Sequence, residues 1–127
     1  MSRDCPLIAV IDDENAVRTA VRRLLQSAGM EVETFCGGGE FLTSLSAQCP
    51  DCAILDLQMP DVTGLDVLAR LAEMQSNVPV VVITGQDSPE AEAEARRAGA
   101  SAFLRKPFKD HVLLEAISTA ITNTPGQ

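Results

Sequence analysis

Short apolar runs and amphipathic segments alternate five times along this chain of 127 residues, and that alternation restricts the fold more than any other feature. Five runs have the length of β-strands: 7–11, 31–35, 52–55, 80–83 and 102–104. The first, third and fourth runs are continuously apolar, as strands covered on both faces are. The run 31–35 alternates polar and apolar residues and is therefore expected at a sheet edge.

The intervals hold segments with apolar residues at helical spacing: 16–28, 41–45, 65–72, 88–99 and 112–121. Two of them begin with recognisable capping residues. Thr63 and Asp66 have the spacing of a capping box, and Ser88 precedes Pro89 at the favoured first helical position. Strict alternation of strand and helix predicts an α/β fold, a doubly wound parallel sheet with five strands and with five helices on its two faces.

The length and composition suit one soluble domain. With 46% hydrophobic and 22% charged residues, the chain resembles an ordinary globular protein. We predict a single domain over 1–127, with a core of about 6–122 and a tail or the start of a linker at 123–127. No apolar run approaches the roughly 20 residues of a membrane span, and the first residues lack a signal peptide pattern, so a cytoplasmic location without membrane contact is expected.

The charge balance disfavours nucleic acid as a direct partner of this segment. Lys and Arg number 10 and Asp and Glu 18, which leaves a formal net charge of −8. Aromatic residues make up 3%, all of them Phe, so no platform for stacking bases is expected.

The chain has four cysteines, two of which, Cys49 and Cys52, form a C-x-x-C motif. Two thiols do not complete a zinc site. A redox motif would be expected at the start of a helix, whereas this pair leads into a predicted strand. Reduced structural thiols are therefore the preferred interpretation.

Charged and hydroxyl side chains stand where four of the predicted strands end: Asp12, Asp13 and Glu14, then Asp56, Thr84 and Lys106. The carboxyl ends of parallel strands meet at one edge of a sheet, so these side chains are expected to converge. Two carboxylates 4 Å apart repel by about 4 kcal/mol at an effective dielectric constant of 20, which a cation such as Mg²⁺ would relieve.

Two alternatives apply to this acidic edge. The first acids could simply favour a helix N-terminus, but that does not account for Asp56 directly after a buried strand. A nucleotide-binding fold would instead place glycines after the first strand, where this chain has Asp12 and Asp13. The sequence contains no G-x-G-x-x-G and no Walker-type motif.

From residue 7 to about 121, the chain resembles the receiver domains of two-component response regulators. The resemblance rests on Asp12-Asp13, on 54–60 with Gly64, on 82–85, and on 98–100 followed by 106–108. It implies a flavodoxin-like receiver fold with strand order 2-1-3-4-5. Segments 83–86 and 106–108 are similar to receivers of the nitrogen-fixation transcription-regulator type, which usually precede a helix-turn-helix domain.

The resemblance also implies roles for the acidic residues. Asp56 would accept a phosphoryl group from a phosphohistidine, on a histidine kinase or a phosphotransfer protein. Asp13, Asp56 and the backbone carbonyl of Gln58 would hold Mg²⁺ directly, and Asp12 would act through a bound water. The implied protein is a signalling switch, not an enzyme, that assists only its own phosphorylation and dephosphorylation.

Further residues are implied in the response to phosphorylation. Lys106 would pair with the phosphoryl oxygens, and the Lys106–Pro107 bond would be cis. Thr84 would turn its hydroxyl toward the phosphoryl group while Phe103 changes rotamer. The fourth helix, whose inward residues are all alanines, would shift at low cost. Its surface with the fifth strand and fifth helix would contact a partner or a second copy in a homodimer.

Two other functions remain open at this stage. An aspartate-based phosphohydrolase of the haloacid dehalogenase type would need a second Asp two residues after Asp56, where Gln58 stands. A pseudo-receiver that binds partners without phosphorylation is disfavoured by the complete acidic set with Thr84 and Lys106. Both a stand-alone receiver and part of a longer DNA-binding regulator fit the sequence.

Overall fold

The computed structural model describes residues 5–85 and 88–123, and it folds as the alternation predicts. Residue 86 and the predicted tail beyond Asn123 lie outside the described residues. The strands are β1 (Leu7–Ile11), β2 (Glu31–Phe35), β3 (Cys52–Asp56), β4 (Val80–Thr84) and β5 (Ala102–Arg105). The helices are α1 (Asn15–Ser27), α2 (Gly38–Ser44), α3 (Gly64–Glu73), α4 (Pro89–Arg97) and α5 (Asp110–Thr122).

The five strands form one parallel sheet in the order β2-β1-β3-β4-β5. This is the order that the resemblance implies. The half-exposed β2 lies at an edge, as its alternating pattern predicts. Between β1 and β4 lies β3, in register with both: Ile54 pairs with Val10 on one side and with Val81 on the other.

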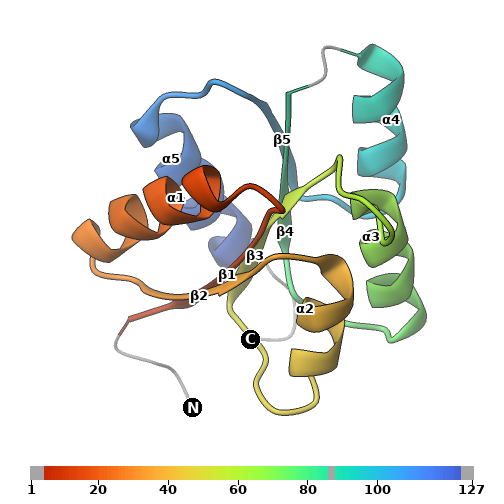
Figure 1. Ribbon diagram of the computed structural model, residues 1–127, viewed down its shortest axis with the longest axis horizontal. Helices are drawn as coiled ribbons and strands as arrows, with labels where there is room; N and C mark the ends of the chain where they lie inside the picture. Colours follow the sequence, from red (N-terminus) through yellow and green to blue (C-terminus); the bar gives the residue numbers. More distant parts are fainter. Residues whose placement is uncertain (1–4, 86–87, 124–127) are drawn as a thin grey trace.

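Helices cover both faces of the sheet, with α1 and α5 on one side and α2, α3 and α4 on the other (Figure 1). Alternate residues of the central strands therefore point into two separate hydrophobic cores. Ile54 and Val81 pack with Val21 of α1 and Ile117 of α5. On the opposite face, the core includes Phe41 of α2, Val67 and Leu71 of α3, and Ala95 of α4.

Strands β3 and β4 each extend one residue further than the predicted runs 52–55 and 80–83, and the added residue is polar in both. Asp56 is the last residue of β3 and Thr84 the last of β4, so the sheet itself orients both side chains. The predicted capping box of α3 is present, because Thr63 accepts from the amide of Asp66 while Asp66 accepts from the amide of Thr63. Ser88 caps α4 as predicted.

Helix α1 buries less of its apolar stripe than its periodicity suggests. Val21 and Leu25 are buried, whereas Ala16, Ala20 and Ala28 are exposed. The stripe is wider than the line along which the helix contacts the sheet, so the small alanines at its margin remain at the surface.

The four cysteines, all within the described residues, form no disulfide, and Cys52 is buried in the core beside β1 and β4. Burial raises the pKa of the Cys52 thiol to about 12, which keeps it protonated and unreactive. Cys36 and Cys49 are exposed. The buried Cys52 fits the interpretation as a structural thiol.

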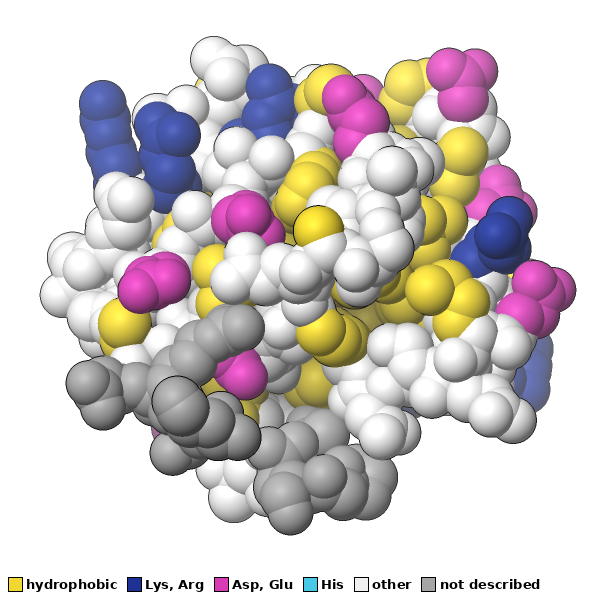
Figure 2. Space-filling view, turned by 90° about the horizontal axis from the view of Figure 1, so that it is seen from below, with side chains coloured by type: hydrophobic (Ala, Val, Ile, Leu, Met, Phe, Trp, Pro, Cys, Tyr) yellow, Lys and Arg dark blue, Asp and Glu magenta, His cyan; other side chains and the backbone are white. Residues whose placement is uncertain are grey.

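Within the described parts of the chain, every helix is too short or too polar to cross a bilayer. Figure 2 shows the face that is turned downward in Figure 1. There the coloured Lys and Arg side chains stand toward the margins, while hydrophobic and uncharged atoms occupy the middle. This face therefore shows no continuous basic area of the kind that holds a phosphate backbone.

Candidate functional site

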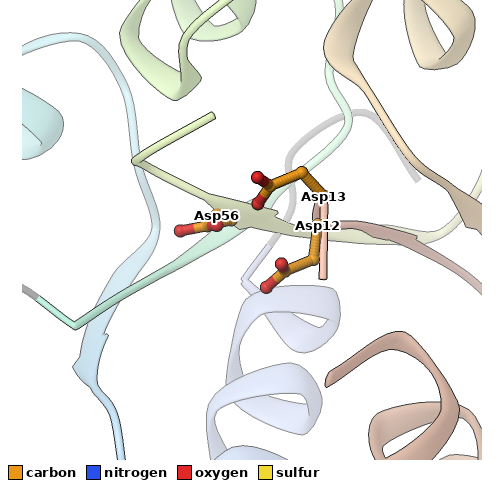
Figure 3. Close-up of side chains that lie close together, drawn as sticks. All are labelled: Asp12, Asp13 and Asp56. Atoms are coloured by element: carbon orange, nitrogen blue, oxygen red, sulfur yellow. The ribbon is translucent and has the colours of Figure 1, made fainter. Parts of the chain in front are cut away.

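Three carboxylates meet at the carboxyl ends of the two central strands β1 and β3. Asp12 and Asp13 directly follow β1, and Asp56 ends β3 (Figure 3). An oxygen of each lies within 4.8 Å of an oxygen of the others, a spacing that allows one metal ion to contact all three. The convergence predicted from the strand ends is therefore present for these acids.

Asp12 is fully buried, and both of its carboxylate oxygens have partners. Oδ1 accepts a hydrogen bond of 2.9 Å from the amide of Glu14, and Oδ2 lies 3.1 Å from Nζ of Lys106. A charge this deeply buried is tolerated only when it is paired and hydrogen-bonded. Asp13 is exposed by contrast, so its carboxylate is open to solvent and to ions.

Asp56 is almost as buried, with 4% of its side chain exposed. Its Oδ1 accepts a hydrogen bond of 3.1 Å from the amide of Gln58, and its Oδ2 faces Lys106 at 3.9 Å. Burial raises the pKa of Asp56 to about 6, and the nearby charges of Asp12 and Asp13 add to that rise. The Gln58 hydrogen bond and the Lys106 ammonium lower the pKa but do not cancel the rise.

Lys106 is held among acids and is not a solvated loop lysine. Its Nζ lies 3.1 Å from Asp12, 3.4 Å from Glu14 and 3.9 Å from Asp56. Burial acts to lower the pKa of Lys106, but the hydrogen bond to Asp12 and the carboxylate charges outweigh burial and raise it. The ammonium is therefore permanently charged at neutral pH, and the Lys106–Pro107 bond that follows is cis, the isomer that the resemblance implies.

Thr84 is fully buried at the end of β4, and its hydroxyl donates to Oε1 of Gln58 over 3.5 Å. Phe103 is buried and pairs with Val82 in the parallel ladder. Since paired residues of parallel strands share a face, as do residues two apart on one strand, Phe103, Val82 and Thr84 lie on the same side of the sheet. Ala95 of α4 belongs to the same core cluster as Phe103.

The donor set fits a hard divalent cation. Mg²⁺ prefers oxygen ligands and is commonly held by one or two carboxylates together with water and phosphate oxygens. The solvent-open Asp13 and the Asp56 oxygen that faces Lys106 match that preference. Asp12 has both oxygens engaged, which favours an indirect role. Burial is the main cause of the raised pKa of Asp56, and the negative charges of Asp12 and Asp13, which a bound cation would offset, add to it.

Two contacts of the site were not predicted from the sequence. Glu14 was listed among the acids at the strand ends. Its ion pair with Lys106 joins residues 92 positions apart, so no local sequence pattern indicates that contact. Arg18 was not assigned any role. Its Nη1 donates a hydrogen bond of 2.6 Å to the backbone carbonyl of Asp12, and its position in an amphipathic helix looks like that of any exposed arginine.

The family described as "Response regulator receiver domain" matches residues 8–118. The response regulator protein TodT of Pseudomonas putida is 37% identical over 127 residues, which are 100% of this chain and 56% of that protein. The transcriptional regulatory protein FixJ of Bradyrhizobium diazoefficiens is 38% identical over 114 residues, covering 90% of this chain and 56% of that protein.

Among solved structures, the crystal structure of FixJ-N has a TM-score of 0.90 at 32% identity and covers 99% of this chain and 100% of that one. A crystal structure of full-length FixJ has a TM-score of 0.87 at 37% identity, covering 92% of this chain and 58% of that one. The chain spans about half the length of the curated relatives it matches.

Proposed function

The chain belongs to the family of response regulator receiver domains of two-component systems, and from that membership we propose that it accepts a phosphoryl group on Asp56 in a Mg²⁺-dependent reaction. The observation that carries this proposal is the arrangement around one carboxylate oxygen. Oδ2 of Asp56 lies 3.9 Å from the Lys106 ammonium, at a rim that Asp12 and Asp13 share.

Asp56 has the properties of the nucleophile. Its Oδ1 is held by the amide of Gln58, so Oδ2 is the oxygen left to attack. A carboxylate attacks in its ionised form, and a pKa of about 6 leaves most of the population ionised at neutral pH. Nearby positive charge shifts that balance further toward the ionised form.

The reaction we propose is in-line phosphoryl transfer. Oδ2 of Asp56 forms a bond to phosphorus while the bond from phosphorus to the nitrogen of a donor phosphohistidine breaks. The electron pair of that bond stays on the imidazole nitrogen, which takes a proton from solvent. The product is an acyl phosphate, and the donor is a histidine kinase or a phosphotransfer protein.

Positioning and charge compensation are the main requirements of such a transfer. Asp13, Asp56 and the backbone carbonyl of Gln58 are the groups proposed to hold Mg²⁺, with Asp12 acting through a water. When bound, the ion would offset negative charge on the carboxylates and the phosphoryl oxygens. Lys106 lies beside the attacking oxygen and supplies the second positive charge.

The proposed switch starts at the Thr84 hydroxyl, which donates to Gln58 in this structure. Three added phosphoryl oxygens are strong acceptors and would compete for that hydroxyl. Movement of Thr84 would free space on the sheet face that it shares with Phe103. Helix α4 packs on this face through small side chains, with Ala95 buried and Ala91 and Ala98 partly buried, so little apolar area opposes its displacement.

The similarity to FixJ, a transcriptional regulatory protein, supports a role at the input of a transcription regulator, and we propose that this regulator acts in the cytoplasm. On this proposal the α4-β5-α5 surface transmits the phosphorylation state, either to an output domain or to a second copy of the chain. DNA contact would then belong to the output region and not to this acidic domain, which carries a net charge of −8.

Incubation with acetyl phosphate and Mg²⁺, followed by mass spectrometry of the intact protein, tests the proposal. We expect a mass gain of one phosphoryl group that EDTA prevents and that Asp56→Asn abolishes. Asp61→Asn is the matched control, because Asp61 is exposed in the next loop at a φ of 66°, which Asn also tolerates. Labelling of Asp56→Asn to the wild-type level would refute the assignment of Asp56.

A further inference from the structure

Arg18 connects the first turn of α1 to the end of β1. Its Nη1 donates a hydrogen bond of 2.6 Å to the backbone carbonyl of Asp12, and its Nη2 donates one of 3.3 Å to Oδ1 of Asn15. Residues 12–14, the acidic loop, begin at the first attachment point and end directly before the second. The half-buried guanidinium thus spans the loop that presents Asp12 and Asp13.

The N-terminus of α1 lacks two features that commonly stabilise the start of a helix, a side-chain cap and an acidic residue in the first turn. Glu14 is the N-cap residue, but its side chain makes no capping hydrogen bond, and the first turn contains no acidic residue. The Glu14 carboxylate turns instead to Lys106 at 3.4 Å. Inside the acidic loop, the amide of Glu14 is bonded to Asp12. Among the residues that the structure describes, Arg18 supplies the side-chain hydrogen bond from α1 to the end of β1.

An arginine is chemically suited to this task. The guanidinium has five donors in a rigid planar arrangement, so it can bond two acceptors of different residues at once. Its hydrogen bond to the Asp12 carbonyl is charge-assisted and short, which makes it stronger than a bond between neutral groups. The same charge stands close to a site that we propose binds a cation, where it repels the ion.

We propose that Arg18 is a positioning residue for the cation site: it holds the acidic loop so that Asp12 and Asp13 face Asp56, and thereby raises the affinity for Mg²⁺ in spite of its own positive charge. This inference rests on the proposed function, because it concerns the same acids. It assigns Arg18 no contact with the ion or with the phosphoryl group.

The two effects of Arg18 have opposite signs, so one substitution separates them. Arg18→Gln removes the charge and the bond to the Asp12 carbonyl. If Arg18 acted through its charge alone, the variant would bind Mg²⁺ more tightly. If it positions the loop, affinity should fall, by about 10-fold, the lower end of the range for residues that orient metal ligands.

The test is isothermal titration calorimetry of the full chain with MgCl₂, together with hydrogen–deuterium exchange in EDTA. Arg18→Gln is expected to lower Mg²⁺ affinity about 10-fold and to accelerate exchange in the segment 12–15 even without metal. Arg22→Gln is the matched control, since Arg22 is exposed one turn further along α1 and carries the same charge. That variant should keep the wild-type affinity and exchange.

Thermal unfolding in EDTA verifies that each variant is folded. Should Arg18→Gln not fold, Arg18→Lys decides, because it keeps the charge but cannot bond both acceptors in the same geometry. Reduced Mg²⁺ affinity in Arg18→Lys supports positioning, and wild-type affinity in it overturns the proposal. Equal or tighter binding by Arg18→Gln also overturns the proposal and leaves the proposed function intact, whereas a wild-type chain that binds no Mg²⁺ refutes both.

Discussion

Replacement of Asp56 by Asn removes a carboxylate that is buried beside two others, and it should make the metal-free protein more stable. With 4% of its side chain exposed, Asp56 has lost nearly all contact with water. Asn has almost the same shape and no charge. It can still accept the hydrogen bond that the Gln58 amide donates to Oδ1 in the wild type.

The expected magnitude follows from the pKa of Asp56, which rises from 3.8 to about 6 in the folded protein. That difference is about two pKa units, so ionised Asp56 lowers the free energy of unfolding by about 3 kcal/mol. The folded protein binds the proton more tightly than the unfolded chain does. The stabilisation by protonated Asp56 is therefore complete below pH 3.8 and is lost as the pH rises through about 6.

Urea denaturation followed by far-ultraviolet circular dichroism measures this effect. Intrinsic fluorescence is unsuitable because the chain has no Trp and no Tyr. In EDTA at about pH 7.5, Asp56→Asn should unfold with a free energy about 2–3 kcal/mol above that of the wild type. At about pH 5 the advantage should shrink by roughly half, because most of the folded wild-type population is then protonated at Asp56.

The control is again Asp61→Asn, whose exposed side chain should leave the free energy of unfolding and its pH dependence unchanged. Mg²⁺ should reduce the advantage of Asp56→Asn, because the cation stabilises the folded wild type. An Asp56→Asn variant that is no more stable than the wild type at neutral pH would refute the electrostatic account. So would an advantage that stays constant between the two pH values.

Three further substitutions test other parts of the site. Lys106→Gln leaves the fully buried Asp12 carboxylate without its ammonium and should lower the free energy of unfolding by about 1.5–3 kcal/mol in urea denaturation; an unchanged value would show that the pair is not stabilising. Gly64→Ala places a Cβ 2.6 Å from the Cα of Leu57, so it should cost about 1–3 kcal/mol and slow labelling by acetyl phosphate, measured by intact mass, because the backbone next to the phosphoacceptor must move; wild-type labelling would contradict this. Thr63→Ala removes the cap of α3 and should lower the thermal midpoint in calorimetry, at a cost of about 1 kcal/mol, while labelling stays at the wild-type rate.

The fold was accessible from the sequence because its pattern is local and repeated. Runs such as 80–83 are apolar on both faces. This pattern is typical of a strand that helices cover on both sides of the sheet. The capping residues Thr63 and Ser88 marked two helix starts for the same local reason. The order of the strands is not contained in this pattern and came from the resemblance to receiver domains.

The candidate site was accessible only in part. That Asp12, Asp13 and Asp56 converge follows from parallel topology, since residues after neighbouring strands meet at one edge whatever their separation in sequence. The different surroundings of Asp12 and Asp13 do not follow from the topology. Asp12 and Asp13 are adjacent and identical in type, yet one is fully buried with both oxygens bonded and the other faces solvent.

By itself, then, the sequence determined the alternation of elements, the two-sided burial of the central strands and the set of acids at their ends, because periodicity and strand direction are properties of the chain. The tertiary structure decided which carboxylate and carbonyl oxygens lie next to the Lys106 ammonium and the Arg18 guanidinium. Lys106 reaches Asp12 across 94 residues, and Arg18 reaches back from α1 to the end of β1. Such contacts depend on the relative placement of elements within about an ångström, and the packing of the whole domain sets that placement.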